Sequence, residues 1–217
     1  MSLILHVETA TRVCSVALSM NGILLNEISE QGEGYVHGER LTLIMQEVMK
    51  NSKKEFDQLD AVSISIGPGS YTGLRIGLST VKGIAFALRC PIIELNTLEI
   101  IANSVSHSGN IFAMLDARRM EVYTHGIDGH KNTLFNSSPM ILDEWTFAEF
   151  DPILCVGDGA EKTKEIWKDR KIIYFDEFEL KASLQIERAV QKFEMNLFSD
   201  PSSIVPKYLK EFEIKKA

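Results

Sequence analysis

The order of apolar and polar positions along the first hundred residues predicts a sheet and two helices. Strands are predicted where apolar and small residues follow one another between polar turns, at residues 3–7, 13–18, 23–28 and 61–66. Apolar side chains then recur three and four positions apart, at Leu41, Ile44, Met45, Val48 and Met49. That spacing predicts an amphipathic helix with one face on a core.

A glycine-rich stretch follows the strand at 61–66 and reads GPGSYTGLRIG at residues 67–77. It continues into a segment that is apolar nearly all round as far as Leu88, which predicts a helix buried in a core or against a partner. Either Ser70 or Thr72 is suited to cap this helix, because a hydroxyl accepts from the free N–H groups of a first turn.

Two phosphate-binding motifs fail on this stretch. A P-loop requires Lys and then Ser or Thr after its last glycine, but Leu74 and Arg75 follow Gly73. The dinucleotide fingerprint fails by one position, because Thr72 stands where its third glycine belongs. We therefore predict a tight strand-to-helix turn rather than a self-sufficient phosphate site.

The second half of the chain repeats the plan of the first. Strands are predicted at 111–115, 121–126, 153–156 and 171–175, helices at 161–167 and 183–197, and an extended end at 204–210. Asp116 falls at the end of its strand as Glu8 does in the first half. Two such halves indicate an α/β fold, duplicated as in actin, hexokinase and the Hsp70 ATPase, each half with a mixed sheet and flanking helices. We place the halves at 1–105 and 106–217, and leave open whether the tail 204–217 packs back on the first half.

Composition narrows the classes of function. The chain has 217 residues, of which 45% are hydrophobic, so it can bury a substantial core. Its net charge of -7, from 23 basic and 30 acidic residues, argues against a dedicated nucleic-acid binder. We expect a cytoplasmic protein without a membrane span, since no apolar run reaches spanning length and the three cysteines are odd in number and far apart.

The glycine-rich stretch and its helix, GPGSYTGLRIGLSTVKGIAFAL, resemble the signature of the TsaB family, also called YeaZ. Other stretches similar to the family are VETATRVCSVAL, HGERL, LNTLEIIA, LDARRMEVY and VPKYLK, spread over nearly the whole chain. Three positions depart from the family pattern, which usually has Asp at Glu8, Ser at Gly38 and Arg at Lys210.

The resemblance implies a non-catalytic scaffold that partners the transferase TsaD in making t6A, the threonylcarbamoyl adenosine of tRNA. It implies a heterodimer with TsaD, the ATPase TsaE in the larger complex, contact with tRNA only through partners, and no cofactor of its own; a homodimer and ATP or ADP at the complex interface are left open. With the apolar helices and their glycines, it predicts a TsaD contact at Leu41, Ile44, Met45, Val48, Gly73, Leu74, Gly77, Leu78 and Val81. The alternative is that these helices are central in their own half and their glycines pack on the sheet.

Three other functions remain as alternatives. An independent ATP-hydrolysing enzyme of the same fold would use Glu8, Thr9, Thr11 and Asp116, the strand-end positions that hold Mg²⁺ and phosphate in the parent fold. A glycoprotease-like metallopeptidase lacks ligands, because Leu41 stands four residues after His37 where the related transferase has a second histidine. A tRNA-binding module is disfavoured by the acidic balance. We expect no catalytic residue and no metal site.

Overall fold

The computed structural model describes residues 2–31 and 37–210, and of His37 only the backbone. The chain forms two compact units, one of residues 1–100 with 179–206 and the other of residues 101–178 with 207–217. The division expected at residue 105 placed 179–206 in the second half, whereas the structure places them in the first unit. The part of the tail beyond residue 210 lies outside the described residues.

The first unit is built on a five-stranded sheet in the order β3-β2-β1-β4-β5. Its strands are β1 (Leu3–Glu8), β2 (Val13–Met20), β3 (Ile23–Gln31), β4 (Ala61–Ser65) and β5 (Ile92–Leu95). The first three form an antiparallel meander, and β4 and β5 continue the sheet in parallel to β1.

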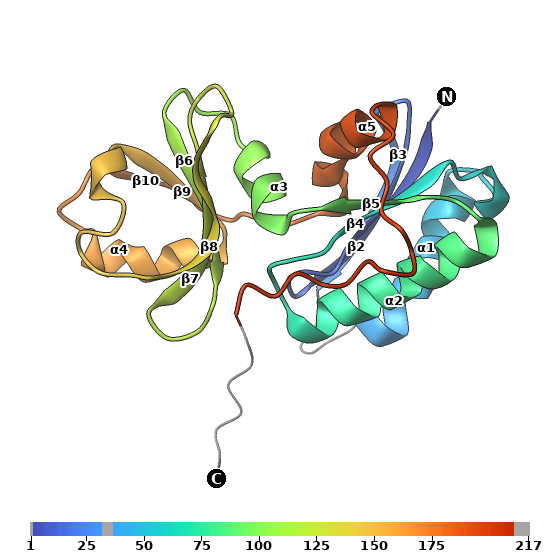
Figure 1. Ribbon diagram of the computed structural model, residues 1–217, viewed down its shortest axis with the longest axis horizontal. Coiled ribbons are helices and arrows are strands. Elements are labelled where there is room, and N and C mark those ends of the chain that lie inside the picture. The colour runs from blue at the N-terminus through green and yellow to red at the C-terminus, as the bar shows by residue number, and fades with distance from the viewer. Residues whose placement is uncertain (1, 32–36, 211–217) are drawn as a thin grey trace, which may run out of the picture. The chain divides into compact units, whose positions relative to one another are not determined.

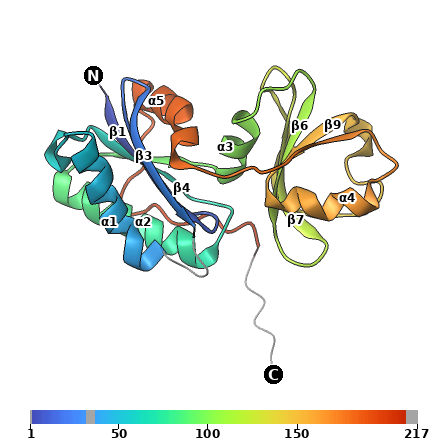
Figure 2. The same ribbon diagram turned by 180° about the vertical axis from the view of Figure 1, so that it is seen from behind.

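The two faces of this sheet differ in polarity, because side chains alternate along each strand. On one face Leu5, Val16 and Ile64 belong to the main apolar core of the unit, under α1 (His37–Asn51) and α2 (Tyr71–Leu88). The opposite face carries buried histidine, glutamate and serine side chains. It is covered by a 3₁₀ helix (Ala182–Gln185) and α5 (Ile186–Glu194); Figures 1 and 2 show α5 on one side of the sheet and α1 and α2 on the other.

The glycine-rich stretch forms the predicted turn between β4 and α2. The hydroxyl of Ser70 accepts a hydrogen bond from the backbone N–H of Gly73 at 3.2 Å, so Ser70 is the N-cap. Gly67 has φ of 121°, a conformation that favours glycine. A Cβ on Gly69 would overlap the carbonyl oxygen of Ala10, so the turn packs directly on the end of the β1–β2 hairpin.

The second unit repeats the topology with the sheet order β10-β9-β6-β7-β8. Its strands are β6 (Asn110–Asp116), β7 (Glu121–Ile127), β8 (Thr133–Ile141), β9 (Ile153–Val156) and β10 (Ile172–Phe175). β6, β7 and β8 form an antiparallel meander, and β9 and β10 run parallel to β6. The same meander followed by two parallel strands in both units bears out the predicted duplication.

The helices of the second half are shorter than predicted. In place of a helix at 161–167 the chain forms a 3₁₀ helix (Asp158–Lys162) and then α4 (Thr163–Ile166). The remaining short helices are α3 (Thr97–Asn103), after β5, and 3₁₀ turns at Phe56–Gln58 and Ala148–Phe150. The core of the second unit contains several aromatic rings, with Phe112 and Trp167 fully buried and Phe147 packed on Phe112 at a ring-centroid distance of 4.5 Å.

Candidate functional site

The residues predicted to meet a partner are buried inside the first unit. Seven of them are at most 4% exposed, and the two glycines are also buried. These nine are Leu41, Ile44, Met45, Val48, Gly73, Leu74, Gly77, Leu78 and Val81. The prediction needs correction on this point, because a side chain already packed in its own core has no surface to offer a partner.

Gly77 lets α2 pack closely on the sheet of its own unit. A Cβ at this position would overlap Thr9 Oγ1 and lie 3.2 Å from Ile64 Cδ1. The glycine therefore lets α2 approach the end of β1 and the middle of β4, rather than another molecule. The alternative interpretation, in which the glycines pack on the sheet, describes Gly77 correctly.

The outward faces of α1 and α2 have a different composition. Phe86 is 85% exposed and Leu43 is 48% exposed, both large for a solvated helix face. Ser79 and Gly83 are also exposed, and a Cβ on Gly83 would meet no atom within 4 Å. Here the surface is open and partly apolar, and a partner helix could approach closely at Gly83.

Glu8, the predicted magnesium ligand, is fully buried on the polar face of the sheet. Its Oε1 accepts from the N–H of Ala10 at 2.8 Å, and its Oε2 accepts from the hydroxyl of Ser65 and from Gln185 Nε2, the latter at 3.1 Å. Burial raises the pKa of Glu8, against the opposing effect of these three hydrogen bonds. Both carboxylate oxygens are thus occupied by groups of the same unit.

The carboxyl group belongs to a continuous buried network that includes His6. Nδ1 and Nε2 of His6 lie 2.7 Å from Ser63 Oγ and Ser19 Oγ, respectively. Because Ser63 donates to Gln185 Oε1 at 2.7 Å, it accepts from His6 Nδ1, and Ser19 then donates to Nε2. One neutral tautomer therefore satisfies the ring, and burial lowers the pKa of His6 to about 3.

Gln185 joins the two ends of this network and was missed by the sequence reasoning. Its Nε2 also donates to the carbonyl of Val7 at 2.7 Å, and it lies fully buried. The available signals were Gln185 itself, next to Ile186 at the start of an apolar helix pattern, and the hydroxyls of Ser63 and Ser65 on alternate positions of a buried strand. Neither signal indicates that these residues meet.

The other candidate nucleotide residues, Thr9, Thr11 and Asp116, have surroundings of their own. Thr9 Oγ1 is buried without a hydrogen-bond partner and faces Gly77, and Thr11 Oγ1 accepts from the N–H of Val13 at 3.2 Å within the turn. Asp116 belongs to the second unit. The four residues therefore do not form one site within either unit.

Asp116 has its own partners in the second unit. Its Oδ1 accepts from Lys162 Nζ at 2.7 Å and from the backbone N–H of Arg118. Partial burial opposes ionisation, but these hydrogen bonds, with Lys162 the stronger, hold the pKa of Asp116 below its usual value. Lys210, where the family usually has Arg, pairs with Glu121 in the same unit.

Neither a cluster of metal ligands nor a membrane-crossing helix occurs in the described part of the chain. Within residues 2–31 and 37–210 no three His, Cys, Asp or Glu side chains are grouped to hold a metal ion. The side chain of His37 lies outside the described residues. None of the described helices combines the length and apolar character needed to cross a membrane.

Comparison with known proteins places the chain in a family. A family profile described as "TsaD: tRNA N6-adenosine threonylcarbamoyltransferase" matches residues 33–145. The tRNA threonylcarbamoyladenosine biosynthesis protein TsaB of Escherichia coli is 32% identical over 183 residues, which cover 80% of this chain and 78% of the relative. The TsaB of Haemophilus influenzae is 34% identical over 125 residues, 55% of this chain and about half (51%) of that protein.

Structural similarity covers more of the chain. YeaZ from Pseudomonas aeruginosa superimposes with a TM-score of 0.81 over 96% of this chain and 100% of that structure at 24% identity, which shows the same fold. The ethanolamine utilization protein EutJ from Carboxydothermus hydrogenoformans shares the architecture more distantly, with a TM-score of 0.56 at 9% identity. The duplicated topology and the superposition on YeaZ agree with the sequence matches. Those matches show that the chain belongs to the TsaB family, also called YeaZ, of tRNA threonylcarbamoyladenosine biosynthesis proteins.

Proposed function

We propose that this chain acts as a non-catalytic partner of TsaD in the threonylcarbamoylation of N6 of adenosine 37 in tRNA. The observation that carries the non-catalytic part is the state of Glu8. A carboxylate that holds Mg²⁺ must offer oxygens to the ion and its waters, whereas Glu8 is fully buried and hydrogen-bonded to Ala10, Ser65 and Gln185. Glu8 stands at the strand end where the parent fold carries its metal-binding acid, and here it is a buried structural residue of the first unit.

The relationship to the transferase itself supports the pairing. A tRNA N6-adenosine threonylcarbamoyltransferase of Anoxybacillus flavithermus is 30% identical to this chain over 119 residues, 35% of its own length. The chain therefore resembles part of the transferase, and two proteins of one fold can pair related surfaces in a pseudo-symmetric interface.

The proposed contact lies on the outward faces of α1 and α2, opposite the residues first predicted. Leu43 and Phe86 would supply apolar area, and Ser79 and Gly83 would let a helix of TsaD approach closely. The buried residues beneath, such as Leu41 and Gly77, would hold the two helices in register. This arrangement keeps the predicted helices and changes the predicted side chains.

The remaining partners follow from the same proposal. The TsaE ATPase would join the complex of this chain with TsaD, and ATP or ADP would sit at the complex interface rather than in either unit of this chain. The tRNA would be held by partners, in keeping with the net charge of -7. Self-association when TsaD is absent would use the same outward faces.

Calorimetry with purified TsaD tests the contact. Replacing Gly83 by leucine adds a side chain where none is crowded, so the fold should be retained while a closely approaching helix is displaced. We expect Gly83→Leu and Phe86→Ala each to weaken binding about tenfold or more. Arg188→Leu, which also places leucine on an exposed helix position, is the matched control on α5 and should bind normally. Normal binding by both interface variants would refute the proposed contact.

A second measurement tests the function rather than the contact. Depletion of this protein in its own cells should lower t6A, as measured by mass spectrometry of digested tRNA, and the Gly83→Leu variant should restore it less well than the Arg188→Leu variant. Unchanged t6A after depletion would remove the functional assignment. Robust ATP hydrolysis by the isolated chain, lost on Glu8→Ala, would favour the independent enzyme instead.

A further inference from the structure

The second unit exposes a tryptophan on a loop that leads from β8 toward β9. Trp145 is 72% exposed, whereas Trp167, the other tryptophan of the chain, is 1% exposed. Ile141 and Met120, whose backbones hydrogen-bond to Thr146 and Leu142 beside it, are 70% and 44% exposed. We call Met120, Ile141 and Trp145 the Trp145 surface. An exposed group of large apolar residues of this kind often marks a protein contact.

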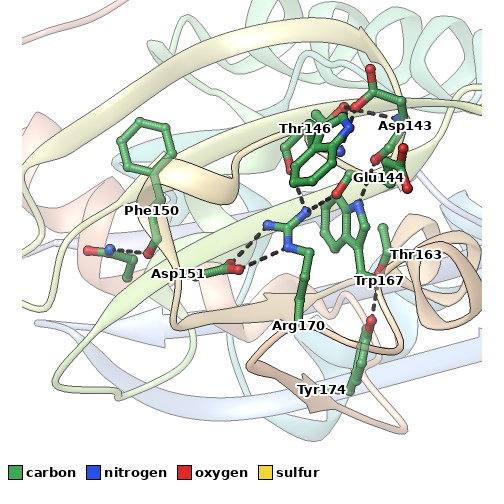
Figure 3. Close-up of polar contacts among 11 residues, drawn as sticks. Asp143, Glu144, Thr146, Phe150, Asp151, Thr163, Trp167, Arg170 and Tyr174 are labelled. Carbon is green, nitrogen blue, oxygen red and sulfur yellow. Dashed lines mark hydrogen bonds and ion pairs between the residues drawn. The ribbon is translucent and has the colours of Figure 1, made fainter.

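The backbone of the loop is fixed by Arg170, as Figure 3 shows. Arg170 Nη1 donates to the carbonyl oxygens of Glu144 at 3.3 Å and Thr146 at 2.8 Å, one on each side of Trp145. The guanidinium is itself fixed by two hydrogen bonds of 2.9 Å to Asp151 and lies 4.2 Å above the ring of Trp167. Arg170 thus binds the carboxylate of Asp151 through two N–H groups at once, the bidentate geometry in which arginine pairs most strongly with a carboxylate.

The backbone polar groups of Trp145 are also satisfied. Its N–H donates to Asp143 Oδ1 at 2.9 Å, and its carbonyl accepts from the N–H of Ala148 at 2.9 Å. Trp167 Nε1 donates a hydrogen bond to the carbonyl oxygen of Asp143 at 2.7 Å (Figure 3). The backbone of the loop is therefore ordered before any partner arrives, and the indole that would meet a partner has only two side-chain torsions to fix.

The charges around the indole indicate the chemistry of the partner. Residues 141–151 contain Asp143, Glu144, Glu149 and Asp151 and no lysine or arginine. Arg170 forms an ion pair with Asp151 and its charge also acts on Asp143, but four acidic side chains against this one arginine leave the loop negative. The hydroxyl of Thr146 and the N–H of Trp145 keep the pKa of Asp143 low, so that it is ionised at neutral pH. Nucleic-acid phosphates would be repelled here, while a lysine or arginine would be attracted and could lie on the indole face.

We propose that the Trp145 surface is a docking site for a protein segment in which lysine or arginine alternates with apolar residues. Trp145 and Ile141 take the apolar side chains, and Glu144 and Glu149 take the cations. This site belongs to the second unit and does not depend on the proposed TsaD contact, since α1 and α2 belong to the first unit.

Fluorescence anisotropy on the full chain tests the proposal with three labelled probes. These are a peptide of four Arg-Leu-Ser repeats, its Glu-Leu-Ser counterpart and a single-stranded RNA of twelve nucleotides. The arginine peptide should bind with a Kd below about 1 mM, and Trp145→Ala should weaken it about tenfold. Glu144→Gln with Glu149→Gln should weaken it about threefold or more and reduce its salt dependence. Ile173→Ala, exposed on β10 at the other edge of the sheet, is the control and should change nothing.

Several results would overturn the proposal. These are no binding of the arginine peptide at 1 mM, equal binding of the glutamate peptide, or unchanged binding after Trp145→Ala. Tighter binding of the RNA that is lost on Trp145→Ala would assign the surface to nucleic acid instead. A thermal melt followed by Trp167 fluorescence would show that the Trp145→Ala variant is folded, because Trp167 is buried in the core of the same unit.

Discussion

Gln185 Nε2 donates a hydrogen bond to Glu8 Oε2 at 3.1 Å, across 177 positions of the chain. The same amide group donates to the carbonyl of Val7 and accepts from Ser63, so a single side chain joins β1 and β4 to the segment that leads into α5. The contact has two consequences. It is one of the contacts that join residues 179–206 to the first unit, and it engages the buried carboxyl group that the parent fold would use for a metal ion.

Replacement of Gln185 by leucine should destabilise the first unit. The change preserves much of the side-chain volume but leaves the carbonyl of Val7 and the hydroxyl of Ser63 buried with fewer partners. Each unsatisfied buried group costs about 1–3 kcal/mol, so we expect a loss of about 2–5 kcal/mol in the free energy of unfolding. Hydrogen exchange of the amides of β1 and β4 measures it directly. Arg188→Ala, on the exposed side of α5, should change this free energy by less than about 0.5 kcal/mol; an equal effect of both variants would contradict the role of Gln185.

The buried histidine should make the first unit sensitive to mild acid. His6 is neutral when folded, with its pKa lowered from 6.5 to about 3, so the unfolded chain binds the proton first as pH falls. The stability that His6 contributes is therefore complete above pH 6.5 and is lost as pH falls toward 3. Between pH 6.5 and 5 the loss should be about 2 kcal/mol.

The variant His6→Gln isolates this effect, because glutamine can bond to serines and does not titrate in this range. The difference in unfolding free energy between the parent and His6→Gln should shrink by about 2 kcal/mol from pH 6.5 to 5. Glu8 acts in the opposite direction, since its raised pKa adds stability that is lost as pH rises through the folded value. It is present in both proteins and largely cancels in the comparison. A difference independent of pH would show that His6 titrates normally.

The fold was largely predictable because alternation is a local property. The strands around residues 61–65 and 153–156 and the helix of Leu41 and Val48 were predicted from spacing alone and are confirmed. The bounds of β8 (Thr133–Ile141) were not predicted, since Asn136 and Pro139 break its pattern. Proline is tolerated there because β8 is the edge strand of its sheet, and an edge position is a tertiary property that local sequence does not show.

The candidate site was predictable only in part. An apolar helix face such as that of Leu74 and Leu78 has the same pattern whether it meets its own sheet or a partner, so the sequence could not distinguish the two. Gly73 and Gly77 of α2 were predicted to meet a partner, yet Gly77 lies against Thr9. Gln185 could not have been assigned to Glu8 from sequence, because nothing local links residues so far apart in the chain.

Arg170 should be the main polar contributor to the stability of the second unit near its tryptophans. In Arg170→Met the carboxylate of Asp151, whose side chain is 22% exposed, loses both of its charged hydrogen bonds, and the carbonyl of Thr146 loses its donor. Hydrogen bonds to charged groups contribute about 1.5–3 kcal/mol, so we expect a loss of about 2–4 kcal/mol in the unfolding free energy. Urea denaturation followed by tryptophan fluorescence reports on this unit alone, since both tryptophans lie in it.

Two further variants test whether the planar shape of the Arg170 guanidinium contributes to stability in addition to its charge. Arg170→Lys keeps the cation but cannot reach Asp151 and both carbonyls together, so it should recover less than half of the loss. Lys168→Met removes an exposed cation two residues away and should be nearly neutral. If Arg170→Lys were as stable as the parent, the contribution would be one of charge alone.

Two of the glycines of α2, Gly77 and Gly83, should respond in opposite ways to the same substitution. In Gly77→Ala the new methyl group would overlap Thr9 Oγ1 and crowd Ile64, so α2 must move away from β1 or Thr9 must change its rotamer; we expect a loss of about 1–3 kcal/mol in the unfolding free energy of the first unit. In Gly83→Ala the methyl group meets nothing within 4 Å, and the better helix propensity of alanine should stabilise by up to about 1 kcal/mol. Hydrogen exchange of the amides of α2 in each variant measures both changes.

The double variant Thr9→Ser with Gly77→Ala should not recover the loss, because the overlapping atom is the hydroxyl oxygen, whereas Thr9→Ala with Gly77→Ala should recover part of it. Equal stabilisation by both single substitutions would show that α2 does not rest on β1 through Gly77.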